Sequence, residues 1–146
     1  MAITYSFLDV SASFAGPTGA FSLTGGAAEE GISIAMREDK NLMTIGAAGD
    51  VQHSLRADNS ATITIRLLKN SPTNALLSSQ YNLQKSSSTL WGQNVISINA
   101  SIGDEIIATD VAFKKQPAVT YSKDGALNEW EFDVGSVTEI LAASII

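Results

Sequence analysis

The only histidine of the chain, His53, is the first residue to weigh for catalysis. A histidine acts as a general base when a nucleophile lies within reach and a further group orients its ring. None of the motifs that supply such partners, G-x-S-x-G, H-E-x-x-H or S-x-x-K, occurs in the sequence. We therefore expect His53 to have a surface or packing role.

A second candidate is a row of carboxylates. Glu129, Glu131 and Asp133 alternate with Trp130 and Phe132, which would place all three carboxylates on one face of a strand. Paired carboxylates catalyse glycoside hydrolysis. A solvated strand face explains the same pattern, and aromatic residues that would stack on sugars make up only 7% of the chain. We favour the solvated face.

Cofactor and metal signatures are also missing from the sequence. Gly46, Gly49 and Asp50 resemble a phosphate loop only in composition, since no Lys-Ser/Thr pair follows and the segment leads into a strand. No D-x-D-x-D-G calcium loop and no cysteine is present. The sequence thus predicts no catalytic residue, no cofactor and no metal, and a protein that is not an enzyme.

Composition places the chain among folded globular proteins. Its 146 residues, 45% of them hydrophobic, predict a single domain over residues 1–146. Only 16% are charged, and such a surface suits faces that become buried in self-association. A net charge of −6 argues against a basic nucleic-acid binder, and the absence of cysteine fits folding in a cytosolic compartment. No apolar segment approaches the roughly 20 residues of a membrane helix, so we expect no stable membrane association.

Alternation with a period of two dominates the N-terminal half and predicts strands. Ile3, Tyr5 and Phe7 would share one face of a first strand. A Gly-Pro-Thr-Gly turn at residues 16–19 precedes further extended segments at residues 20–24, 32–36 and 43–45. The charged run Arg37, Glu38, Asp39, Lys40 and Asn41 is expected to be a loop or a hairpin tip, and Gly49-Asp50 a further bend.

The clearest strand spans Ala61 to Leu67, with Thr62, Thr64 and Arg66 on its polar face. The period then changes. Ser71 followed by Pro72 is typical of a helix start, and the apolar spacing after it predicts a short helix that buries Leu76, Leu77 and Tyr81. Further strands are expected at residues 94–100, 105–113, 119–122 and 129–137, with a Lys-Asp-Gly turn at 123–125. One helix among many short strands predicts a mainly β fold, an antiparallel β-sandwich or barrel with one flanking α-helix.

Trp91 and Trp130 are the two largest aromatic side chains. We expect them to anchor the core, with a subunit boundary as the alternative, because tryptophan is enriched at interfaces.

The order of several segments resembles that of the tail tube proteins of contractile-tailed bacteriophages. These segments are the opening TYSFLDV, the block EEGISI…EDKNLMTIGAAGDVQHS, the strand-to-helix junction ATITIRLLKNSPTNALL and the late YSKDG…EWEF. The resemblance covers most of the chain, although each segment alone has low specificity.

The resemblance implies a structural subunit of the inner tail tube. Such subunits form hexameric rings in which one sheet of each copy helps to close a continuous barrel, and the rings stack into a hollow tube that conducts DNA during ejection. The implied partners are further copies of the chain, the tail sheath protein, and baseplate and tail terminator proteins. The implied location is the virion tail, after synthesis in the host bacterial cytoplasm.

Two sets of residues become candidates for assembly. Both charge signs in residues 37–41 would suit a contact between stacked rings, with a solvated turn as the alternative. Thr62 and Thr64 would suit the lining of the bore, where small, neutral or acidic residues let DNA slide. Arg66 is the one basic residue on this face. Either a carboxylate of a neighbouring subunit neutralises it, or this strand belongs to an outer sheet. The net negative charge of the chain is consistent either with a bore along which DNA slides or with a role in keeping the protein soluble.

Two other interpretations stay open from the sequence. One is a monomeric β-sandwich binding module for carbohydrates or surfaces, and the other is a baseplate or tail protein of similar fold. Exposed aromatic residues on a monomer would indicate the first, and filaments on microscope grids would indicate a tube.

Overall fold

The computed structural model describes residues 4–23 and 27–141, and the described chain is mainly β with one α-helix. The predicted fold class is confirmed. In chain order the elements are a 3-10 helix η1 (Phe7–Asp9), β1 (Val10–Gly16), β2 (Gly19–Ser22), β3 (Ala27–Met36), β4 (Asn41–Ile45), β5 (Val51–Leu55), β6 (Ala61–Leu68), α1 (Pro72–Gln84), β7 (Asn94–Ala100), β8 (Glu105–Lys115) and β9 (Leu127–Ile140).

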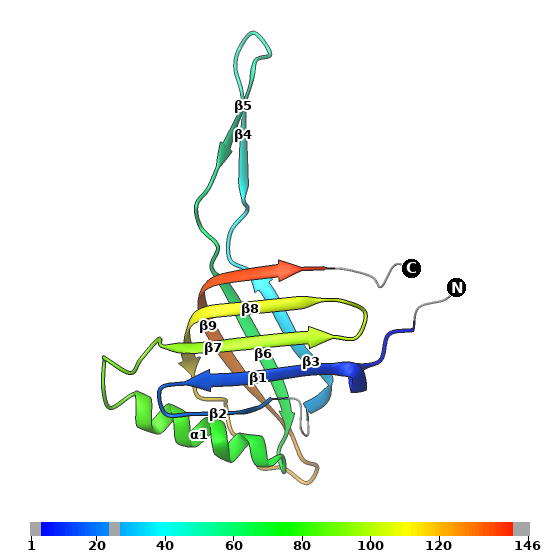
Figure 1. Ribbon diagram of the computed structural model, residues 1–146, viewed down its shortest axis with the longest axis vertical. Helices are drawn as coiled ribbons and strands as arrows, with labels where there is room; N and C mark the ends of the chain where they lie inside the picture. The colour runs from blue at the N-terminus through cyan, green and yellow to red at the C-terminus, as the bar shows by residue number, and fades with distance from the viewer. Residues whose placement is uncertain (1–3, 24–26, 142–146) are drawn as a thin grey trace.

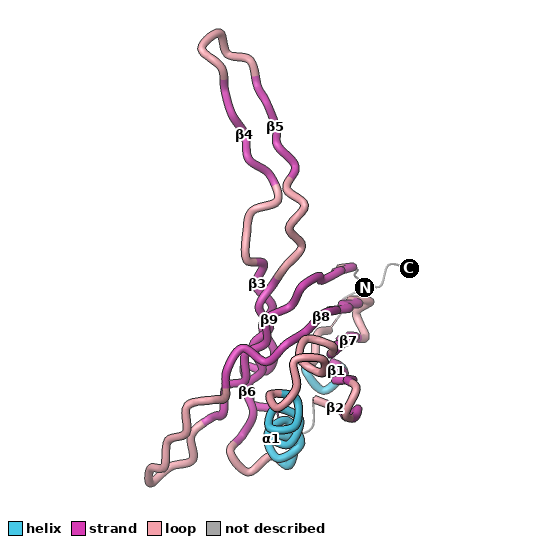
Figure 2. Tube along the Cα trace, turned by 90° about the vertical axis from the view of Figure 1, so that its left-hand side faces the viewer, coloured by secondary structure: helices cyan, strands magenta, loops and turns pink. Residues whose placement is uncertain are grey.

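Seven of the strands form one antiparallel sheet in the order β2-β1-β7-β8-β9-β6-β3, and β4 pairs only with β5. The large sheet folds over into two layers, one containing β1, β2 and β7 and the other β3 and β6 (Figures 1 and 2). Two strands separate β1 from β9 in the sheet, yet the ring centroids of Phe14 and Phe132 lie 6.0 Å apart. This contact crosses the core between the layers.

The fold-over is made within β8 and β9, which pass from one layer to the other. Asp110 in β8 has a left-handed backbone with φ 54°, and it lies opposite Gly135 between the pairs Thr109–Ser136 and Val111–Val134. A Cβ atom at Gly135 would come within 2.8 Å of the Asp110 Cβ. The absence of a side chain at Gly135 therefore allows the two strands to approach closely where the sheet turns.

Alternate residues of the strands fill the core. On β6, Ala61, Ile63, Ile65 and Leu67 are buried and their neighbours face outward, as the alternation predicts. Trp130 is buried, and its indole N–H donates to the Asn74 side chain at 3.0 Å, so its predicted anchoring role is confirmed. Trp91 is only partly buried and packs against the edge of this cluster.

Helix α1 begins where the sequence predicts. The Ser71 hydroxyl accepts a hydrogen bond from the Thr73 N–H at 3.3 Å, and Pro72 is the first helical residue. Leu77 is fully buried, whereas Leu76 remains 46% exposed, so the expectation that Leu76 is buried is wrong. Helix α1 meets the sheet along a narrow stripe, and Leu76 faces away from it.

A buried polar cluster joins the end of α1 to the sheet. The side chains of Gln84, the last residue of α1, and Asn94, the first of β7, are fully buried and hydrogen-bonded to each other. The Asn94 amide also donates to the Val111 carbonyl at 3.0 Å. Gln80, on the preceding turn of the helix, donates to the Thr18 carbonyl at 3.2 Å and so ties α1 to the β1–β2 turn.

Two predicted strands are wrong. Tyr5 precedes η1, which contains Phe7, so they do not form a first strand; Ile3 lies outside the described residues. The Asp9 N–H donates a hydrogen bond to the Ser6 carbonyl, which closes a turn where an extended backbone was expected. The Phe7 ring lies against Gly31, which has φ 58°.

The other wrong strand is residues 119–122, which form a loop. Lys69 holds this loop by donating to the Thr120 carbonyl and by lying 4.0 Å from the centre of the Tyr121 ring. Side-chain contacts therefore fix the segment without a sheet ladder. Residues 20–22 are extended as expected, and residue 24 lies outside the described part of the chain.

Candidate assembly surfaces

The most prominent surface is a long two-stranded ribbon, β4 and β5 with their connecting turn (residues 41–55), which we call the arm. It projects from one end of the sheet, beyond β3 and β6 (Figures 1 and 2). Its tip is the turn from Gly46 to Asp50, closed by the Gly46 N–H bonding to the Asp50 carbonyl at 2.7 Å. Gly49 in this turn has φ 88°, which favours glycine. The bend predicted at Gly49 is confirmed.

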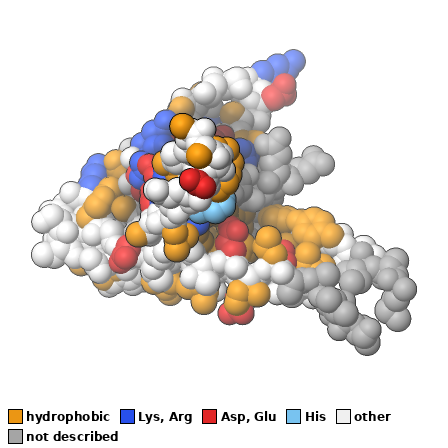
Figure 3. All heavy atoms as spheres, turned by 90° about the horizontal axis from the view of Figure 1, so that it is seen from above, with side chains coloured by type: hydrophobic (Ala, Val, Ile, Leu, Met, Phe, Trp, Pro, Cys, Tyr) orange, Lys and Arg blue, Asp and Glu red, His pale blue; other side chains and the backbone are white. Residues whose placement is uncertain are grey.

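The two faces of the arm differ in chemistry. Strand alternation places Met43, Ile45, Val51 and Leu55 on one face, and these side chains are 53%, 59%, 55% and 82% exposed. Leu42, Thr44, Gln52 and Ser54 form the opposite, mostly polar face. Figure 3 looks down onto the tip and shows hydrophobic side chains gathered around the arm.

His53 lies on the apolar face of the arm, opposite Met43. Its Nδ1 atom is 3.2 Å from the side-chain nitrogen of Asn41. His53 is exposed, and its place on a strand that belongs only to the arm agrees with a surface role.

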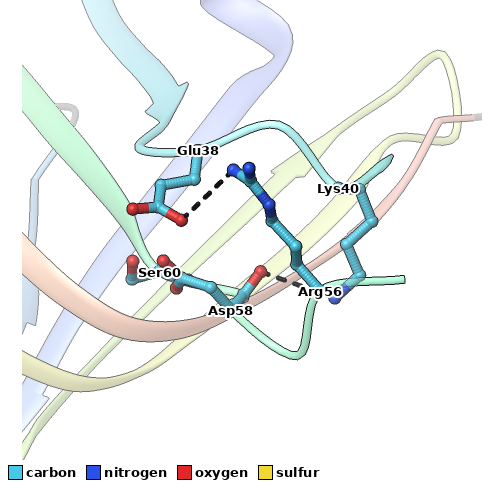
Figure 4. A network of polar contacts seen from close by, with 5 residues as sticks. All are labelled: Glu38, Lys40, Arg56, Asp58 and Ser60. Atoms are coloured by element: carbon cyan, nitrogen blue, oxygen red, sulfur yellow. Dashed lines mark hydrogen bonds and ion pairs between the residues drawn. The ribbon is translucent and has the colours of Figure 1, made fainter. Parts of the chain in front are cut away.

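Residues 37–40 form a loop, which is one of the two alternatives expected from the sequence, and Asn41 begins β4. The loop lies where the arm meets the sheet, so the other alternative, a hairpin tip, is wrong. We call residues 37–40 and 56–60 the joint. Glu38 Oε2 lies 3.7 Å from Arg56 Nη1 (Figure 4). Lys40 Nζ donates to Asn59 Oδ1 at 2.6 Å. Glu38 and Lys40, two of the charges proposed from the sequence for a contact between rings, thus have partners within the chain. The contact between stacked rings stays a prediction.

Backbone hydrogen bonds continue through the joint. The Arg37 N–H donates to the Ser60 carbonyl at 3.2 Å, and the Arg56 N–H to the Lys40 carbonyl at 2.9 Å. Asp58 Oδ1 accepts the Ser60 N–H at 2.8 Å. Hydrogen bonds from the Ser60 side chain and backbone lower the pKa of Asp58, and Arg37 and Lys40 add a smaller effect in the same direction. Together these contacts orient the arm on the sheet.

A polar face covers the outside of β6 and β9. Thr62 pairs with Asp133, Thr64 with Glu131, and Arg66 with Glu129. The threonines and the acidic row come from separate segments of the sequence, and the structure places them side by side on one sheet face. The acidic row is a strand face, as expected.

Two basic residues beside this polar face, Arg66 and Lys114, have acidic partners within the same chain. Arg66 Nε lies 3.7 Å from Glu129 Oε2, and Arg66 Nη1 donates to Ser33 Oγ at 3.1 Å. Lys114 Nζ lies 3.9 Å from Glu131 Oε2. Arg66 is thus compensated by its own chain. The two alternatives expected from the sequence were a neighbouring subunit's carboxylate and an outer-sheet position for this strand.

The sheet has two open edges among the described residues, β2 and β3. An edge strand presents unpaired N–H and C=O groups on its outer side, and these groups pair readily with another chain. Strand β3 is ten residues long and β2 four. Both edges are therefore candidate surfaces for lateral association.

The end of the molecule opposite the arm carries the last surface. A cavity of about 460 Å³, which we call the base cavity, is lined by Leu68, Lys69, Asn70, Gly125 and Ala126. Leu68 and Leu127 are paired residues on β6 and β9, and both are exposed beside this cavity. Val119 and Tyr121 of the neighbouring loop are exposed as well. We call Leu68, Val119, Tyr121 and Leu127 the base patch.

Within the described residues, no group of three or more His, Cys, Asp or Glu side chains is placed to hold a metal ion. No helix in the same part of the chain is long and apolar enough to cross a membrane. The surfaces described above are suited to contact with other proteins.

Comparison with solved structures gives the fold. The chain matches the extracellular contractile injection system PVC sheath–tube complex in its extended state, with a TM-score of 0.60, 13% identity and coverage of 94% of this chain and 91% of the other. It also matches the anti-feeding prophage tube terminating cap (TM-score 0.57, 13% identity, coverage 97% and 95%). A third match is the anti-feeding prophage baseplate, 6-fold symmetrised (TM-score 0.53, 12% identity, coverage 99% and 98%). No curated protein matches the sequence.

A family model identifies the protein family, which similarity of fold alone does not. The model described as bacteriophage PhiTE tail tube protein matches residues 1–142, which is nearly the whole chain. The resemblance noted from the sequence is thereby confirmed. This chain belongs to the bacteriophage PhiTE tail tube protein family and is a structural subunit of a phage tail tube.

Proposed function

We propose that six copies of this chain close into a ring and that the rings stack into a tube through which DNA passes. The observation that carries the proposal is the pair of open edges, β2 and β3, on one antiparallel sheet. Pairing between copies satisfies both edges, and closure of the ring leaves none exposed. The 6-fold symmetrised baseplate among the similar structures supports the ring size.

The polar face of β6 and β9 is the surface that we assign to the bore, with Thr62 and Thr64 among its lining residues. DNA is retained by unpaired Lys and Arg, because each phosphate contact releases counterions. Here Arg66 is held by Glu129 and Ser33, and Lys114 by Glu131. In a bore built from this face these two cations are paired and the threonine hydroxyls are neutral, which supports passage without retention.

The similar structures also support the partners that we propose. They belong to a sheath–tube complex, a tube terminating cap and a baseplate. By analogy, the outside of the tube contacts a sheath protein, and its ends contact baseplate and terminator proteins. The protein would be made in the host cytoplasm and function in the virion tail.

Electron microscopy of the purified full chain tests this proposal. We expect rings or tubes on negatively stained grids at high protein concentration, with averaged end views that show six subunits. A sedimentation profile of monomers alone at millimolar protein, with empty grids, would contradict assembly. End views with another symmetry would overturn the ring size and leave the tube intact.

A further inference from the structure

His53 is the one ionisable residue in strands β4 and β5. It lies on the apolar face of the arm, opposite Met43 and between Val51 and Leu55 on its own strand. These three apolar side chains are all more than half exposed. Contiguous exposed apolar surface marks an interaction site, and a histidine in its midst makes contact at that site sensitive to pH.

The contact between Asn41 and His53 fits a neutral imidazole. The Asn41 side-chain nitrogen lies 3.2 Å from His53 Nδ1. An amide nitrogen only donates hydrogen bonds, so Nδ1 accepts and the ring proton is on Nε2. A second proton, on Nδ1, would set donor against donor unless the Asn41 amide turned over. The arm is therefore arranged around an uncharged His53.

Nothing on this face would stabilise a charged ring. The other residues of the face are Asn41, Met43, Ile45, Val51 and Leu55.

The ionisable residues nearest to His53 along the chain are Asp50 at the tip and Lys40 and Arg56 at the joint, all outside the two strands. Strands β4 and β5 pair only with each other and project away from the sheet, so within the described residues no charged group of another element faces His53 (Figure 2). Burial of an imidazolium without a counter-ion costs far more free energy than burial of a neutral imidazole.

The apolar face is continuous with an edge that we assign to association between copies. The arm extends β3 and β6 through the backbone hydrogen bonds of the joint, and β3 is an open edge of the sheet. A two-stranded ribbon is marginally stable alone in water, so the arm gains stability when its apolar face is covered. A second copy of this chain is the partner that this continuity favours.

We propose that a second copy covers the apolar face of the arm in the tube and that protonation of His53 opposes this cover. This inference rests on the proposed tube and names a group that regulates its assembly. Because the covered face accepts the neutral ring and disfavours the charged one, assembly is favoured where His53 is neutral. It weakens as the pH falls through the range, roughly pH 5 to 8, in which histidine gains its proton. With one proton bound per released subunit, the protein concentration needed for tubes rises by up to about tenfold per pH unit.

Tube formation measured against pH tests the inference in the full chain. Pelleting and negatively stained grids of the wild type should show tubes at about pH 8 and few or none at about pH 5.5. Circular dichroism at each pH reports whether the subunit stays folded. His53→Gln removes the titrating group and should make the tube fraction independent of pH over this range. His53→Lys carries a lasting positive charge and should raise the concentration needed for tubes even at about pH 8.

An exchange of two neighbouring residues gives the matched control. The double variant Gln52→His, His53→Gln keeps the composition of the chain and moves the histidine to the polar face of the arm. It should behave like His53→Gln. Loss of tubes in acid by this variant as steep as that of the wild type would show that the apolar position of His53 is irrelevant, and would overturn the proposal.

The other outcomes separate the two proposals. Equal tube fractions of the wild type at both pH values would overturn the role of His53 and leave the tube function standing. Tubes favoured by acid would do the same, because they would place a carboxylate of the second copy beside His53. If the subunit unfolds in acid, His53→Lys and His53→Gln are compared at about pH 8, where equal assembly overturns the proposal. Wild-type protein that forms neither rings nor tubes at any pH would overturn both.

Discussion

The side-chain amides of Gln84 and Asn94 form a reciprocal pair of hydrogen bonds, each 2.8 Å long, between the end of α1 and the start of β7. Both side chains are fully buried. A buried amide that loses its partner keeps the cost of its desolvation. This pair therefore fixes the helix on the sheet more firmly than its small size suggests.

We predict that Gln84→Leu or Asn94→Leu alone lowers the free energy of unfolding by about 1–3 kcal/mol, because each deprives the remaining buried amide of hydrogen-bond partners. The double variant should lose less than the sum of the two single losses. Urea unfolding of the four proteins measures this coupling. Additive losses would show that the two amides act independently.

The exposed fractions of Leu76 and Leu77 predict unequal effects from the same substitution. Leu77→Ala should lower the free energy of unfolding by about 2–5 kcal/mol, because Leu77 is fully buried between α1 and the sheet. Leu76→Ala, one residue earlier and 46% exposed, should change it by less than about 0.5 kcal/mol. Thermal or urea unfolding compares the two variants. Equal losses would contradict the observed orientation of α1.

Acid should loosen the joint at Asp58. The pKa of Asp58 is lowered from its ordinary value of 3.8, chiefly by hydrogen bonds from Ser60. The folded chain thus favours the charged carboxylate, and this stabilisation is present above pH 3.8 and is lost as the pH falls through the lowered pKa. An NMR titration should give a midpoint below 3.8 for Asp58, and Ser60→Ala should raise it. A midpoint at or above 3.8 in the wild type would show that these hydrogen bonds do not favour the ionised form.

Charge reversal in the joint distinguishes two possible roles of residues 37–41, which are to orient the arm or to contact a neighbouring ring directly. Glu38→Lys removes the ion pair with Arg56 and should misdirect the arm, which shortens the tubes while the subunit stays folded. Asp39→Lys is the neighbouring control and leaves that pair intact. Shortening by Glu38→Lys alone indicates a joint that orients the arm, whereas shortening by both supports a direct contact between rings. Tube lengths on grids measure the outcome, and normal lengths for both variants would exclude either role.

The polar face yields a prediction about DNA. Glu129→Gln removes the carboxylate beside Arg66, so the net charge of the assembled bore should become more positive and the bore should retain DNA more strongly at low salt. Adding Arg66→Gln to this variant should abolish the gain. Co-sedimentation of DNA fragments with tubes over a range of salt concentrations measures retention. Identical retention by the wild type and Glu129→Gln would place this face away from the DNA path.

Local patterns predicted most of the elements but not their arrangement. Ala61 to Leu67 alternates without interruption, and Ser71-Pro72 marks a helix start, so β6 and α1 follow from side-chain chemistry alone. Residues 119–122 also have strand propensity, yet the structure holds them by contacts with Lys69, which is distant in sequence. A pattern within four residues carries no information about such a partner.

For the assembly surfaces, too, local sequence patterns predicted the strands but not what the strands contact. Alternation in residues 41–45 predicts a strand equally well whether its apolar side meets a core or solvent, so the projecting arm was not predicted. The partner of Arg66 was missed because it depends on the register between β6 and β9, and a sequence read one strand at a time does not contain that register. The alternating carboxylates at 129, 131 and 133 were the one signal in the sequence for a partner of Arg66. They predict an acidic strand face, and a basic residue on a neighbouring strand can pair with such a face.

The fold-over at Asp110 and Gly135 has a mechanical consequence. Because β8 and β9 run through both layers, the two walls of the subunit are joined by continuous main chain as well as by side-chain contacts. Shear between the walls would have to stretch covalent backbone before the layers could separate. In a tube built from such subunits, we expect the two sheet layers of each subunit to stay together under a force along the tube axis.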